Sequence, residues 1–147
     1  VHKGYSVISL EKSMMNSEVG FGRKILQVLE DRGISFEHMP TGIDTMCVVV
    51  ESQSLAPHRE EILREMEALT RPEGTVSITD ELSIIATVGR GMVHNCGTAA
   101  RLFSAMSKAR INVRMIDQGS SELSIIVGVN DNDYEATVRA IYHEFVG

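Results

Sequence analysis

The chain has 147 residues with 14 basic and 20 acidic side chains, and its formal net charge is −6. It has neither the basic patch of a nucleic-acid-binding protein nor a run of ~20 apolar residues that would cross a membrane. We therefore expect that it binds neither a nucleic acid nor a membrane. Cys47 and Cys96 lack CxxC spacing, which argues against a disulfide framework and suits the cytoplasm. Because the chain begins at Val1 rather than Met, we expect a fragment of a longer protein.

The first half of the chain predicts strands and helices in the order strand, helix, strand, strand, helix, strand. β-Branched and aromatic runs indicate the strands, and apolar stripes at helical spacing indicate the helices. The expected strands are 5–11, 34–39, 45–51 and 75–79. The expected helices are 21–32 and a second one that starts near Pro57 and ends at Pro72-Glu73-Gly74.

The second half repeats this order but stops one strand early. Its expected strands are 82–88, 111–116 and 122–129, and its expected helices are 98–109 and 134–145. Residues Tyr5–Val50 return as Leu82–Val127 at one fixed offset of 77, so that Gly20 falls on Gly97 and Glu37 on Arg114. A fixed internal period marks a duplicated structural unit.

The repeated order predicts an α+β protein made of two ferredoxin-like βαββαβ units. Each unit has an antiparallel sheet with helices on one face, and the expected domains are 4–80 and 81–147. The fourth strand of the second unit is missing from the chain. Small sheets with an open edge and an uncovered face tend to pair with one another, so we expect a homodimer.

Glycines at a predicted helix start indicate a ligand site. Gly20-Phe21-Gly22 precedes the first helix, whose unpaired N–H groups attract a carboxylate or phosphate; the alternative is a tight turn without a ligand. The Thr41-Gly42-Ile43-Asp44 turn is polar and small, as is its counterpart in the second copy. Glu37 belongs either to a solvated outer face or, opposite the glycine loop, to a site for the ammonium group of an amino acid.

The sequence contains no clear catalytic arrangement. Its five histidines lack metal-ligand spacing, and we find no Ser/His/Asp set and no phosphate loop of the GxxxxGK[ST] type. We therefore predict a binding module with no catalytic residue and no metal. An acylphosphatase-type enzyme is the alternative from another class, because Gly20-Phe21-Gly22-Arg23 faintly resembles the anion loop of that family, although its glycine spacing differs.

Several motifs carry a resemblance to a known family. In the first half they are Val7-Ile8-Ser9-Leu10, Gly20-Phe21-Gly22-Arg23-Lys24-Ile25 and Gly33-Ile34-Ser35. In the second half they are Val88-Gly89-Arg90-Gly91-Met92, Gly97-Thr98-Ala99-Ala100-Arg101-Leu102-Phe103 and Ile116-Asp117-Gln118-Gly119-Ser120-Ser121-Glu122-Leu123-Ser124. The first set resembles the first, and the second set the second, of the tandem ACT domains at the C-terminal end of aspartate kinases. The resemblance implies a regulatory region without its N-terminal kinase domain, and the missing strand is then expected from upstream.

The resemblance also implies ligands and partners. It implies feedback control by lysine and/or threonine bound at the seam of an ACT–ACT homodimer, and ATP and Mg only for the kinase domain, so this chain has no cofactor of its own. A free-standing double-ACT sensor that regulates another protein is the alternative. Matched onto this sequence, the implied effector-binding residues are Met15, Glu18, Gly20, Phe21, Gly22, Phe36, Glu37, Thr41, Gly42, Ile43, Asn95, Gln118, Ser120 and Ser121.

Overall fold

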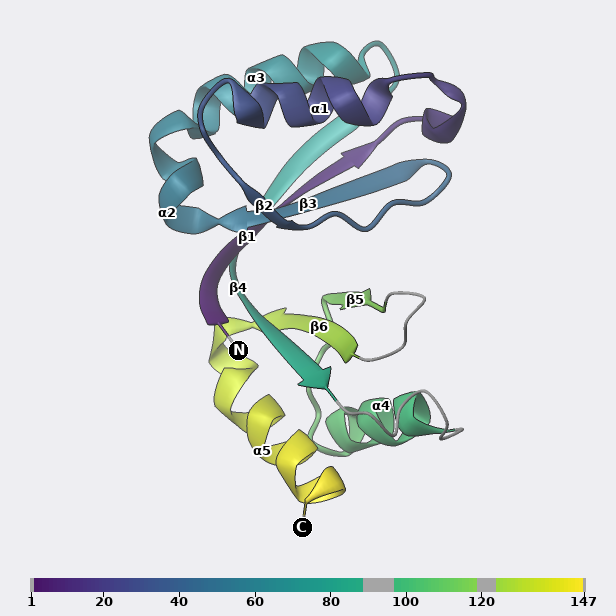
Figure 1. Ribbon diagram of the computed structural model, residues 1–147, viewed down its shortest axis with the longest axis vertical. Coiled ribbons are helices and arrows are strands. Elements are labelled where there is room, and N and C mark those ends of the chain that lie inside the picture. Colours follow the sequence, from purple (N-terminus) through teal and green to yellow (C-terminus); the bar gives the residue numbers. More distant parts are fainter. Residues whose placement is uncertain (1, 89–96, 119–123, 147) are drawn as a thin grey trace. The chain divides into compact units, whose positions relative to one another are not determined.

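The computed structural model describes residues 2–88, 97–118 and 124–146. Contacts divide the chain into two compact units (Figure 1), a first unit of Gly4–Asp80 and a second unit of Val1–Lys3 with Glu81–Gly147. Two long strands, β1 (His2–Glu11) and β4 (Thr75–Val88), contribute residues to both units. None of the described helices is long and apolar enough to cross a membrane.

The first unit has the predicted alternation of strands and helices. Its strand order is β2-β3-β1-β4, with β3 antiparallel to both β1 and β2, and α1 and α3 cover one face of this sheet (Figure 1). The elements that lie wholly within it are α1 (Phe21–Glu30), β2 (Phe36–His38), β3 (Thr45–Glu51), α2 (Ser52–Leu55) and α3 (Arg59–Thr70).

The core of the first unit lies between the sheet and its helices. Alternate residues along a strand share one face, so Ile8 and Leu10 of β1 join Val48 and Val50 of β3 on the helix side. The apolar stripe of α1 meets them there, with Ile25 fully buried. The remaining fully buried large side chains of this core are Phe21, Leu29, Leu55, Ile62 and Met66.

The second unit repeats this arrangement, and its described part ends with a helix. Its elements are α4 (Thr98–Lys108), β5 (Met115–Asp117), β6 (Ser124–Asn130) and α5 (Tyr134–Phe145), and β6 pairs antiparallel with β4 and β5. Leu102 and Met106 of α4 pack with Ile125, Val127 and Val129 of β6. The predicted α+β, ferredoxin-like fold class is confirmed.

The boundaries of four predicted strands are wrong. A single strand, β4, replaces the two strands expected at 75–79 and 82–88, and β2 and β5 are each only three residues long. The charged pair Asp80-Glu81 interrupts the apolar alternation and therefore resembles a turn in the sequence. In the structure Asp80 is bonded by Ser6 and Arg59, and these contacts let a carboxylate remain within a strand.

The fixed offset of 77 holds for the first strand and helix of the repeat and fails after them. Ile8 pairs with Val48, whereas its counterpart Ile85 pairs with Val127 rather than with Ile125. The offset for β2 and β3 is therefore 79, and the counterpart of Glu37 is Ile116, not Arg114. A shift of two residues keeps every side chain on its original face of the sheet. The apolar pattern of the sequence therefore does not reveal the change of offset.

A buried serine connects β1 to the start of the second helix in the first unit. Ser6 is fully buried; its Oγ donates to Asp80 Oδ1 at 2.7 Å and lies 2.7 Å from Ser52 Oγ. Arg59 Nη1 donates to the same carboxylate at 2.9 Å. The hydrogen bonds from Arg59 and Ser6 hold the pKa of Asp80 below its usual value, because both stabilise the charged form.

This cluster predicts a pH-dependent loss of stability in the Asp80→Asn variant. A group with a lowered pKa contributes stability above its ordinary pKa of 3.8, and that contribution is lost as the pH falls below this value. We expect the variant to be less stable than wild type by ~0.5–1 kcal/mol at pH 7, since the ion pair is partly exposed. Urea unfolding at pH 7 and at pH 3 measures the difference, which should shrink at pH 3; a gap of equal size at both values would contradict the assignment.

Candidate functional site

One small pocket of about 200 Å³ collects most of the predicted effector residues of the first unit. It lies between the loop that leads into α1 and the turn that leads into β3. Its lining consists of Met15, Glu18, Gly20, Phe21, Gly22, Thr41, Gly42 and Met46. Seven of these eight residues are among the predicted set, so the structure brings the glycine loop and the polar turn together.

The helix start supplies backbone donors to this pocket. Gly20 is the N-cap of α1 and has φ 83°, a left-handed conformation that glycine adopts without steric cost. Because Gly20 has no side chain, the first N–H groups of α1 have no acceptor from an N-cap side chain. These donors and the positive end of the helix dipole favour a carboxylate at this point.

Glu18 contributes a negative charge to the pocket, held by two lysines. Lys12 Nζ lies 2.5 Å from Glu18 Oε1, and Lys24 Nζ lies 3.6 Å from Glu18 Oε2. The hydrogen bond from Lys12, followed by the positive charges of both lysines, lowers the pKa of Glu18, so its carboxylate is ionised at neutral pH. Lys12 also lies over the ring of Phe21, 5.1 Å from its centroid.

Met46 forms the floor of the pocket on the side of β3. Thr41 pairs with Met46 in an isolated antiparallel bridge, and Gly42 donates its N–H to the carbonyl of Thr45 at 2.8 Å. A methyl group at Gly22 would lie 3.6 Å from Met46 Cε. Met46 is not among the predicted site residues; its place in the alternation of β3, on the helix side, is the signal that would have indicated it.

Three predicted residues of the first unit lie outside this pocket. Phe36 lines a different cavity, and Ile43 has an exposed fraction of 62%. Glu37 is exposed and does not line the pocket. Burial raises the pKa of the Tyr5 hydroxyl, and the negative charges of Glu37 and then Glu51 raise it further. Within one chain, therefore, Glu37 does not face the glycine loop.

The second unit retains the helix start but offers less of the predicted site. Gly97 is the N-cap of α4 with φ 86°, which matches Gly20. Gln118 follows β5 and is exposed. Asn95, Ser120 and Ser121 lie outside the described residues. Across the parts of the chain that the structure describes, no group of three or more His, Cys, Asp or Glu residues is placed to hold a metal ion.

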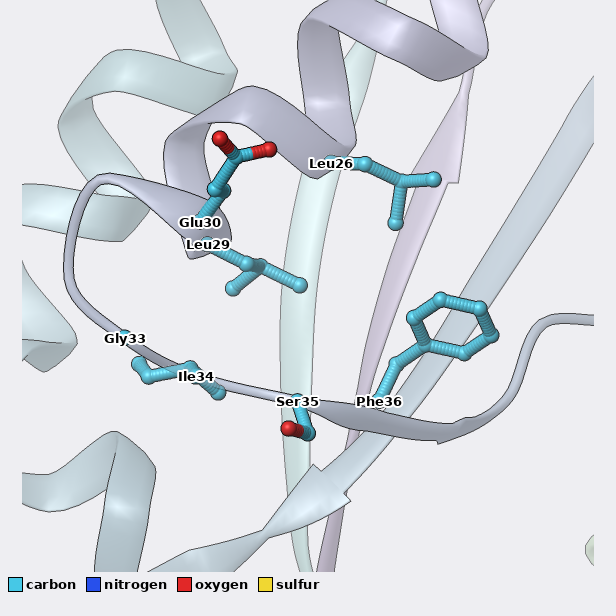
Figure 2. Close-up of a pocket in the computed structure, with 7 residues that line it drawn as sticks. All are labelled: Leu26, Leu29, Glu30, Gly33, Ile34, Ser35 and Phe36. Carbon is cyan, nitrogen blue, oxygen red and sulfur yellow. The ribbon is translucent and has the colours of Figure 1, made fainter.

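A larger cavity of about 490 Å³ lies between α1 and β2. Figure 2 shows Leu26 and Leu29 reaching into it from α1 and Phe36 reaching into it from β2. Gly33, Ile34 and Ser35 form the connection beneath these side chains. Phe36 is 45% exposed, and β2 occupies the end of the strand order in this unit. An exposed aromatic ring beside an open strand edge is typical of an interface.

Comparison with known proteins connects this fold to one family. Residues 85–145 match the model of the ACT domain. Aspartokinase 3 of Bacillus subtilis is 42% identical over 97% of this chain, which spans 31% of that relative. The crystal structure of Clostridium acetobutylicum aspartate kinase is 45% identical, with a TM-score of 0.91 over 97% of this chain and 33% of that one. The chain thus spans about a third of the length of these relatives.

Two further solved structures share the fold. The regulatory subunit of aspartate kinase from Thermus thermophilus is 24% identical, with a TM-score of 0.76 over 97% of this chain and 92% of that one. Escherichia coli aspartokinase III in complex with lysine and aspartate is 20% identical, with a TM-score of 0.79 over 99% of this chain and 32% of that one. The match to a regulatory subunit covers nearly all of both chains. On this evidence the chain belongs to the ACT-domain regulatory regions of the aspartate kinases.

Proposed function

We propose that this chain is the allosteric sensor of an aspartate kinase and that it binds lysine and/or threonine in the pocket at Gly20–Gly22. The observation that carries the proposal is the pocket itself, which joins the start of α1 to Glu18 and the Thr41–Gly42 turn. A fold relative in complex with lysine supports the choice of ligand class.

The proposed binding mode follows from the chemistry of the pocket walls. The N–H groups at the start of α1 take the effector carboxylate, because these donors lack an N-cap acceptor and the helix dipole favours an anion. Glu18 offers an ionised carboxylate to a cationic group of the effector. The side chains of Met15, Phe21 and Met46 line the pocket and provide an apolar surface for the aliphatic stem.

A second copy of the chain is the proposed partner of the first unit. The cavity beside Phe36 and the open edge of β2 lie next to each other, so two copies paired edge to edge would cover both. Such pairing places Glu37 of β2 at the seam, where its proposed contact with an effector ammonium would require the partner copy. Coupling to a kinase domain then requires that the effector bind two states of the enzyme with different affinity.

Calorimetric titration with lysine and threonine tests the proposed site, with Gly22→Ala as the decisive variant. The added methyl group projects toward Met46 in the pocket and competes with the ligand for space. We expect wild type to bind at least one of the two amino acids and the variant to bind it at least about tenfold more weakly, a change of ~1.4 kcal/mol. The fold should be retained or gain up to ~1 kcal/mol, because Ala replaces Gly within a helix.

Two controls make the titration specific. D-Lysine and D-threonine should bind poorly, since a site that fixes both the carboxylate and the ammonium distinguishes enantiomers. Glu37→Gln should weaken binding by roughly 10- to 100-fold if Glu37 meets the ammonium, as a charge-assisted bond is typically worth ~1.5–3 kcal/mol. Equal affinities of wild type and Glu37→Gln would identify Glu37 as a solvated surface charge. If neither amino acid binds wild type, the proposed function is wrong.

A further inference from the structure

Asp44 connects the two loops that form the walls of the pocket. Its carboxylate oxygen Oδ1 accepts the backbone N–H of Met14 at 2.7 Å, and its carbonyl oxygen accepts the N–H of Lys12 at 2.9 Å. Asp44 lies at the end of the turn that contains Thr41 and Gly42, whereas Lys12 and Met14 begin the loop that leads to Gly20. Asp44 thus forms two hydrogen bonds with the loop that makes the opposite wall of the pocket.

The conformation of Met14 requires support from another part of the chain. Its backbone has φ 56° and ψ 36°, a left-handed conformation that is unfavourable for residues with a Cβ atom. Its side chain is 59% exposed, so packing contributes little to holding it there. The bond from the Met14 N–H to Asp44 acts directly on the strained residue.

Met14 determines where the next residues of the loop lie. The carbonyl of Met14 accepts hydrogen bonds from both the N–H and the Oγ of Ser17, at 3.0 and 2.8 Å. This turn directs Met15, only 3% exposed, into the core and brings Glu18 to the pocket. A change at Met14 therefore moves two residues of the lining together.

We infer that Asp44 is a positioning residue for the effector pocket: it holds Met14 in the left-handed conformation and so fixes the Met15–Gly20 wall against the Thr41–Gly42 wall. The inference rests on the proposed function for the identity of the ligand. Asp44 is absent from the pocket lining, so it acts through Met14 and not by contact with the effector.

The second copy of the repeat offers an internal comparison at the level of sequence. At the offset of 77, Gly91 occupies the position of Met14. Leu123 directly precedes β6, as Asp44 directly precedes β3. In sequence, the position of Asp44 thus has leucine in the second copy, and the position of Met14 has glycine, the residue type that adopts a left-handed conformation without steric cost.

A set of three variants tests the inference in the 147-residue chain. Asp44→Ala removes the acceptor and should weaken lysine or threonine binding about tenfold, whereas Asp44→Asn retains an oxygen acceptor and should bind nearly as wild type does. Met14→Gly added to Asp44→Ala should restore most of the lost affinity, because a glycine at this position would hold the conformation unaided.

Hydrogen exchange of the Ser17 and Glu18 amides, which donate to the carbonyls of Met14 and Met15, provides a readout that does not depend on the ligand; it is measured by NMR without effector. Exchange should accelerate at least about fivefold in Asp44→Ala and return toward wild type in the double variant. Unchanged exchange in Asp44→Ala, or a double variant that exchanges as fast as the single one, would overturn the inference. If wild type binds neither amino acid while the exchange pattern appears, the proposed effector is wrong and the positioning role stands.

Discussion

Phe36→Asp is expected to dissociate the proposed homodimer, with a dissociation constant at least about 100-fold above that of wild type. Phe36 projects into the cavity between α1 and β2 from the end of the strand order (Figure 2). An uncompensated charge buried at an interface costs ~3–5 kcal/mol, and each decade in affinity corresponds to ~1.4 kcal/mol. Sedimentation velocity over a range of protein concentrations measures the change.

A matched control separates loss of the interface from loss of the fold. Val146→Asp places the same charge on a residue that is 66% exposed at the end of α5, far in sequence from the cavity residues, and should leave the dimer intact. Circular dichroism should show an unchanged fold for both variants. Wild type that remains monomeric at high micromolar concentration, or a Phe36→Asp dimer of normal affinity, would contradict edge-to-edge pairing through this surface.

Gly74→Ala is expected to lower the free energy of unfolding by ~3 kcal/mol or more, the largest effect that we predict for a single methyl group. A Cβ atom at Gly74 would lie 2.5 Å from the carbonyl oxygen of Thr70 and 2.7 Å from that of Glu11. Both are backbone atoms, so no rotamer change relieves the overlap, and overpacking of this kind typically costs ~1–3 kcal/mol, occasionally more. Typical domains have only ~5–15 kcal/mol to lose.

Urea unfolding followed by circular dichroism tests this prediction against Gly22→Ala. The same methyl group at Gly22 meets nothing closer than Met46 Cε, at 3.6 Å, which is ordinary contact, and this variant should unfold at wild-type or higher denaturant concentration. Equal midpoints for the two variants would show that the chain where α3 leads into β4 relaxes freely, contrary to its close packing against β1.

The sequence by itself determined the alternation of elements and most of the residues that line the pocket of the first unit. Local patterns decide both: apolar periodicity sets which face of Phe21–Glu30 and Thr45–Glu51 is buried, and a glycine before a helix marks a left-handed N-cap. Gly20 and Gly97 have nearly the same φ, 83° and 86°, as their matched positions predict. The resemblance to ACT domains added the residues of the loop, and the structure gathers most of them around one pocket.

Only the tertiary structure decided how strands pair and which residues meet across loops. The change of offset from 77 to 79 is invisible in the sequence, because a shift of two residues moves no side chain to the other face of a sheet. β4 continues through Asp80 because Ser6 and Arg59, distant in sequence, bond its carboxylate. The hydrogen bond between Asp44 and Met14 likewise joins residues that are 30 positions apart in the sequence. The packing of the whole unit determines such partners, whereas the periodicity of the sequence indicates only which face of a strand or helix a residue occupies.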